Sequence, residues 1–76
     1  MGGYIRMSLK KYTLIVCDIV SGQPIGFVQS VSYTKQTFKI TPNITSAKTY
    51  TNYDKICAEI DDLTLYSGGK YIFLID

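Results

Sequence analysis

The sequence predicts a small α+β domain, in which an antiparallel sheet of about four strands, in the order β-β-β-α-β, carries one amphipathic helix packed on one face. Three segments rich in β-branched and aromatic residues lie before residue 41, separated by tight turns. One apolar stripe with helical spacing follows between residues 53 and 64, and an apolar segment at 71–75 comes last. A chain of 76 residues has the size of one domain.

The first predicted strand spans residues 11–19. Apolar side chains occupy both of its alternating faces, which is typical of a central strand. Residues 20–24 have turn chemistry, because Gly22 readily adopts positive φ and Pro24 has no amide hydrogen to donate. We expect Asp18 to end the strand and cap this turn. Because the link to the next strand is short, residues 11–33 are predicted to form an antiparallel hairpin.

The second predicted strand spans residues 25–33. Strict alternation divides its residues between two faces. One face holds Ile25, Phe27, Gln29, Val31 and Tyr33. The other face holds Gly26, Val28, Ser30 and Ser32.

A third, shorter strand is predicted over residues 36–40 after a tight turn. Phe38 and Ile40 point inward, and Lys39 points outward. Because a lysine on an exposed edge discourages unwanted strand pairing, we place this strand at an edge. Asn43 then caps a short helical turn over residues 44–48.

The helix is predicted to begin at Thr51 or Asn52, either of which can cap it, with Asp54 in the first turn. Its apolar stripe consists of Tyr53, Ile56, Cys57, Ile60, Leu63 and Thr64. Its polar side consists of Asp54, Lys55, Ala58, Glu59, Asp61 and Asp62. Gly68 and Gly69 stop the helix, and residues 71–75 form a last, inner strand.

The domain boundaries and the two cysteines follow from the same pattern. We expect residues 1–9 to form a flexible N-terminal extension and residues 10–76 to form the single α+β domain. Cys17 and Cys57 both fall on positions predicted to face the core, so we expect two reduced, buried thiols; a disulfide between them is the alternative.

No secretion signal or membrane-length apolar stretch is visible, which favours a cytoplasmic protein that does not enter a membrane.

The residue types that catalysis usually requires are scarce. The chain has no histidine, so catalysis and metal ligation that depend on imidazole are excluded, and no glycine-rich phosphate loop is present. We therefore expect no catalytic residues, no metal and no cofactor. Asp18 and the pair Glu59 and Asp62 are the carboxylates left for an enzyme hypothesis, but we interpret them as a turn cap and a solvated helix face.

Seven tyrosines stand out in so short a chain. Tyrosine combines apolar area with a polar tip, which suits interfaces, although it also replaces phenylalanine in a thin core. We expect a non-enzymatic protein-interaction module whose partner is a host factor or a second copy of the chain, which would make it a homodimer. The candidate partner-binding residues are Tyr12, Phe27, Tyr33, Lys35 and Lys39. The alternative is a weak single-stranded nucleic-acid-binding protein with a sheet face of lysines and tyrosines, using Lys10, Lys11, Lys35 and Lys39.

Three stretches carry a resemblance in style and topology rather than a specific motif. They are Tyr12–Asp18 running to Gly22, Ile25–Val28, and Ile44–Tyr50 before the helix. With these the chain resembles small accessory proteins encoded by phages and prophages of Gram-positive bacteria. The resemblance implies expression in a host cytoplasm, and an inhibitor or modulator that binds one host factor, such as a defence nuclease. It transfers no functional residue.

Overall fold

The computed structural model describes residues 10–76, so the predicted extension over residues 1–9 lies outside the described residues. The element order confirms the predicted α+β fold with one long helix. The elements are β1 (Leu14–Asp18), β2 (Pro24–Ser32), β3 (Thr37–Thr41), a short 3-10 helix η1 (Ile44–Ser46), α1 (Tyr53–Tyr66) and β4 (Tyr71–Ile75). No helix in the described residues is long and apolar enough to cross a membrane.

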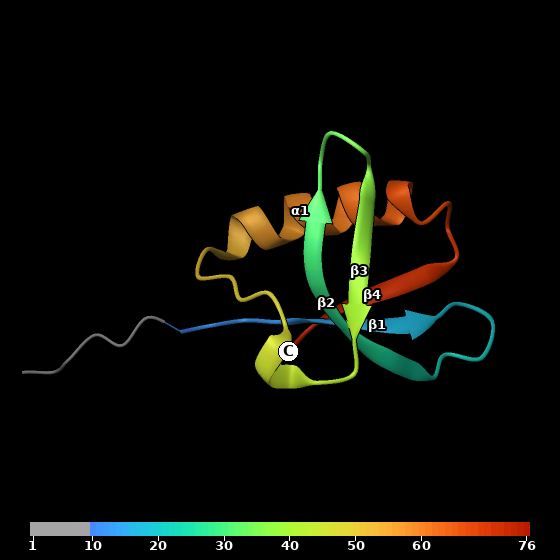
Figure 1. Ribbon diagram of the computed structural model, residues 1–76, viewed down its shortest axis with the longest axis horizontal. Helices are drawn as coiled ribbons and strands as arrows, with labels where there is room; N and C mark the ends of the chain where they lie inside the picture. Colours follow the sequence, from blue (N-terminus) through green and yellow to red (C-terminus); the bar gives the residue numbers. More distant parts are fainter. Residues whose placement is uncertain (1–9) are drawn as a thin grey trace, which may run out of the picture.

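The four strands form one antiparallel sheet in the order β3-β2-β1-β4 (Figure 1). β1 lies in the middle, as its two apolar faces predict. The prediction of an inner position for residues 71–75 is wrong, because among the described residues β4 pairs with β1 alone and forms an edge of the sheet. Its second apolar row comes from Ile72 and Leu74, which lie on the sheet face away from the helix and remain 40% and 49% exposed.

The strict alternation predicted for β2 is interrupted by an irregularity. Val28 pairs with Ile40, but the next pair is Ser30 with Lys39, so Gln29 is an extra residue. The insertion turns Val28 and Val31 to the same side, where both pack in the core beneath the helix. Phe27 pairs with Ile15 and points to the opposite side of the sheet. The predicted face shared by Phe27 and Val31 is therefore wrong.

Helix α1 begins where the sequence predicts, because Asn52 accepts a hydrogen bond from the Lys55 amide at 3.2 Å. Ile56 and Leu63 are fully buried against the sheet. Cys57 is exposed, which corrects its predicted core position, and Tyr53 and Thr64 are exposed as well. The buried residues of α1 are Ile56, Glu59 and Leu63, and these face the sheet. The prediction that Glu59 is solvated is therefore wrong.

The predicted turns are found close to their expected places. Asp18 accepts a hydrogen bond from the Ser21 amide at 3.1 Å, and this bond lowers the pKa of the Asp18 carboxyl. Asn43 caps η1 through the Thr45 amide. β3 begins at Thr37, one residue later than predicted, because Gln36 adopts a φ of 56° within the turn.

Gly26 lies where β2 and β3 approach each other closely. A Cβ at this position would lie 2.7 Å from the Thr41 carbonyl oxygen and 2.8 Å from Ile40 Cγ2. The backbone oxygen cannot move without breaking the sheet, so we expect Gly26→Ala to lower the free energy of unfolding by about 1–3 kcal/mol. Urea denaturation checks this, with the exposed Ser30→Ala as control; equal midpoints for the two variants would contradict the close approach.

Candidate functional site

A row of side chains crosses the sheet on the face away from the helix. Ile15 of β1 pairs with Phe27 on one side and with Leu74 on the other, and Phe27 pairs with Thr41 of β3. Directly paired residues point to the same face of a sheet, so this row joins all four strands. Ile72 adds a second position, because it lies two residues before Leu74. We name Ile15, Phe27, Ile72 and Leu74 the open face.

The two sides of the sheet differ sharply in burial. On the helix side, Leu14, Val16 and Val28 are completely buried. On the open face, Ile72 and Leu74 are exposed, and Ile15 and Phe27 are only partly buried. Helix α1 packs on the other side of the sheet, over the core cluster. The result is a contiguous apolar surface in contact with solvent, which in soluble proteins commonly marks an interaction site.

The open face carries no charge of its own. Its four side chains are aliphatic or aromatic. Lys39 on β3 lies beside it and pairs with Ser30 rather than with a member of the open face. A surface with an uncharged centre and a charged rim resembles the centre of a protein–protein interface in composition.

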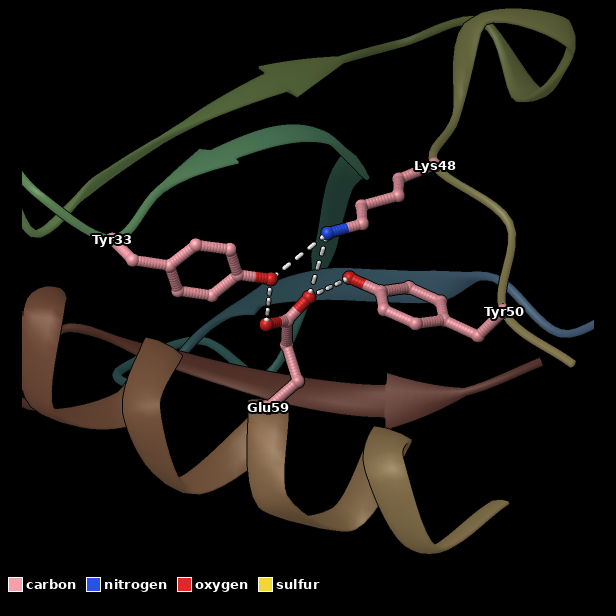
Figure 2. A network of polar contacts seen from close by, with 4 residues as sticks. All are labelled: Tyr33, Lys48, Tyr50 and Glu59. Carbon is pink, nitrogen blue, oxygen red and sulfur yellow. Dashed lines mark hydrogen bonds and ion pairs between the residues drawn. The ribbon is translucent and has the colours of Figure 1, made fainter. Parts of the chain in front are cut away.

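A second feature, on the helix side, is a polar cluster around Glu59 (Figure 2). Tyr33 Oη donates to Glu59 Oε1 at 2.5 Å, and Tyr50 Oη donates to Glu59 Oε2 at 2.6 Å. Lys48 Nζ lies 3.1 Å from Glu59 Oε2 and donates to Tyr33 Oη at 3.0 Å. Glu59 is only 6% exposed, so these hydroxyl and ammonium groups supply the hydrogen bonds that water would otherwise donate to its carboxylate.

The charges in this cluster are fixed by its hydrogen bonds. Burial by itself would raise the pKa of Glu59, but the bonds from Tyr33, Tyr50 and Lys48 outweigh burial and lower it. Burial would likewise lower the pKa of Lys48, but Tyr33 and Glu59 raise it. Burial and the bond to the Glu59 carboxylate both raise the pKa of Tyr50. At neutral pH the cluster therefore holds the Glu59 carboxylate against the Lys48 ammonium group and the neutral Tyr50 hydroxyl group.

The cluster holds the chain before α1 onto the helix. Lys48 and Tyr50 come from the segment between η1 and α1, and Tyr33 is the first residue after β2. A groove of about 550 Å³ lies beside the cluster. The charges that line it balance, with Lys48 and Lys55 against Glu59 and Asp62, so the groove favours neither an anion nor a cation. We interpret the cluster as structural.

The five predicted binding residues do not come together. Phe27 lies on the open face, whereas Tyr33 belongs to the Glu59 cluster. Tyr12 packs on the core and meets the Tyr53 ring edge-on at 5.9 Å between centroids. Lys35 lies in the turn between β2 and β3, and Lys39 is exposed on β3.

Sequence reasoning missed most of the open face. The signal was present, because residues 11–19 and 71–75 are apolar on both alternating faces. Such a pattern predicts strands with a neighbour on both sides. It also describes a sheet whose second face is apolar and uncovered.

The comparisons with known proteins add nothing to this geometry: no protein-family model, curated protein or solved structure matches the chain.

Proposed function

We propose that this protein works by binding another protein through its open face, without catalysing a reaction. The observation that carries the proposal is the row Leu74, Ile15 and Phe27, which is apolar and partly exposed on a sheet whose other face packs against α1. Solvated faces of antiparallel sheets are ordinarily polar. An apolar one gains free energy when another layer covers it.

The partner we propose is a neutral, apolar surface of a protein. A lone charged side chain or a phosphate group set against the open face would lose its water without gaining a partner of opposite charge. Burial of the exposed half of a side chain such as Leu74 is worth roughly 1 kcal/mol, so each open-face residue contributes about a fivefold change in affinity.

The same chemistry argues against nucleic acid as the partner. Binding to a phosphate backbone depends on lysines and arginines that neutralise it. The open face has none, and the lysines of the nucleic-acid alternative are spread over the start of the chain, the β2–β3 turn and β3. Loss of binding after nuclease treatment is therefore an outcome that would overturn the proposal.

The identity of the partner is proposed on the resemblance alone. Small phage and prophage accessory proteins imply a host factor as target, such as a defence nuclease, and a host cytoplasm as the place of action. On this basis we propose that the chain inhibits or modulates that factor by covering part of its surface.

A charged residue on the open face tests the binding surface. We expect Phe27→Lys to lower the amount of partner captured from a nuclease-treated bacterial lysate at least tenfold, because binding would bury the lysine without a counter-charge. Leu74→Lys should act in the same way. Leu65→Lys is the matched control, since Leu65 is 73% exposed on α1 and apolar as well.

Mass spectrometry of the captured material, with circular dichroism to confirm that each variant is folded, gives the readout. A protein retained by the wild type and Leu65→Lys but not by Phe27→Lys or Leu74→Lys supports the proposal. A partner retained equally by all four proteins would show that binding uses another surface, and capture of no protein would remove the proposal altogether.

A further inference from the structure

The outer edge of β4 has no partner among residues 10–76. β4 is the last strand of the sheet and pairs only with β1. Thr13 and Asp76 exchange both backbone hydrogen bonds, and the Ile19 amide donates to the Lys70 carbonyl. Bonded pairs alternate along an antiparallel ladder, so Ile72 and Leu74 also turn their backbone groups toward β1.

The backbone groups of Tyr71, Phe73 and Ile75 consequently point away from β1. No backbone or side-chain hydrogen bond in the described residues reaches their outward amides and carbonyls. A row of such groups is a template on which another strand can pair.

The two edges of the sheet differ in how they are protected. At the other edge, β3 carries Lys39, and its pairing with β2 is irregular, both of which discourage strand addition. β4 pairs with β1 without a register shift and contains neither lysine nor proline. Within residues 10–76, the edge formed by β4 is therefore the one open to a further strand.

We propose that the strand that pairs there is β4 of a second copy, antiparallel, about a twofold axis at Phe73. In this register Phe73 pairs with its own counterpart, and Tyr71 pairs with Ile75 of the partner subunit. All three outward residues then exchange two hydrogen bonds per pair, so that each outward amide and carbonyl is satisfied.

The side chains on the open side of β4 favour the same register. Lys70, Ile72, Leu74 and Asp76 follow one another there at every second position. The twofold pairing sets Lys70 opposite Asp76 of the partner subunit and Ile72 opposite Leu74 of the partner subunit. A shift of two residues in either copy would set a charged residue against an apolar one, so the strand is complementary to itself in one register.

The result is a continuous sheet built from two four-stranded sheets, with the two open faces side by side. The inference does not rest on the proposed function, since the edge and the face are different surfaces. A five-residue strand pair is small for an interface, below the roughly 1,200 Å² of specific complexes, so we expect a dissociation constant on the order of 10–100 µM.

Charge reversal with rescue tests the pairing, measured by sedimentation equilibrium of the full chain at low salt. Lys70 and Asp76 are exposed, so we expect their substitution to leave the monomer folded. We expect Lys70→Glu and Asp76→Lys each to weaken the dimer about tenfold, because both symmetric ion pairs become repulsive. The double variant Lys70→Glu with Asp76→Lys should restore the wild-type constant to within about threefold.

Hydrogen exchange supplies the second readout. We expect the amides of Tyr71, Phe73 and Ile75 to become protected as the protein concentration rises, while Phe27→Lys, two strands away, leaves the dimer unchanged. A wild type that is monomeric up to 1 mM, on the scale of the weakest specific affinities, would overturn the inference. So would an unrescued double variant, or a dimer that dissociates with Phe27→Lys but not with Lys70→Glu, which would place association on the open face.

Discussion

Replacement of Glu59 by alanine is expected to lower the free energy of unfolding by about 3 kcal/mol, a large share of the stability of a domain this size. The cost arises because the buried Tyr50 hydroxyl and the Lys48 ammonium group lose their acceptor and regain little water. Tyr33 is 52% exposed and can turn to solvent, so its share is smaller. Urea denaturation at neutral pH gives the difference.

Two controls separate this network from ordinary loss of charge. Asp62→Ala removes a carboxylate from an exposed position on the same helix and should change the unfolding free energy by less than about 0.5 kcal/mol. Tyr50→Phe should cost more than Tyr33→Phe. If Glu59→Ala and Asp62→Ala behaved alike, the cluster would contribute no stability.

The Glu59 carboxylate should also make the free energy of unfolding depend on pH. The folded state lowers the pKa of Glu59 below the ordinary value of 4.5, so its contribution is complete above that value and is lost as the pH falls through the lowered pKa. Asp18, whose pKa is also lowered, adds a similar dependence. Glu59→Gln should therefore flatten the acid side of the profile relative to the wild type, and Asp18→Asn should leave the Glu59 part in place.

Leu63→Ala is expected to cost about 2–5 kcal/mol in unfolding free energy. Leu63 is fully buried where α1 meets the sheet, so the truncation leaves a cavity in a core that is already thin. Leu65→Ala is the matched control, because Leu65 lies two residues along the same helix and is 73% exposed; it should change stability by less than about 0.5 kcal/mol. Similar losses from both variants would contradict the orientation of the helix.

The order and ends of the elements could be predicted because their signals are local. Asn52 caps the helix three residues ahead of the amide that it binds, and Asp18 does the same for its turn. Gly68 and Gly69 adopt positive φ where the helix stops. Each of these signals lies within a few residues of the structure that it determines.

The features that sequence reasoning missed depend on distant pairings. Glu59 is buried because Tyr33 and Lys48, which lie 26 and 11 residues away in the chain, satisfy its carboxylate. The edge position of β4 depends on which strand β1 takes as its second neighbour. The extra residue at Gln29 turns Val31 into the core and leaves Phe27 on the other side. No local pattern specifies any of these.

The candidate site also depends on pairings between distant residues, which local sequence patterns do not specify. Tyrosines and lysines drew attention because they are conspicuous in composition, yet the structure uses Tyr12, Tyr33 and Tyr50 to cover and hold the core. The apolar alternation of residues 11–19 and 71–75 was the more informative signal. Its meaning became clear only when the pairing of Ile15 with Phe27 and Leu74 was known.

Hydroxyl-radical footprinting of the complex captured from lysate is the most direct test of the open face as a protein-binding surface. Oxidation of Phe27, Ile72 and Leu74 should fall strongly relative to the free protein, while oxidation of Leu65 on the helix stays the same. Unchanged oxidation of the open face, with protection of Leu65 instead, would contradict the account and move the binding surface to the helix.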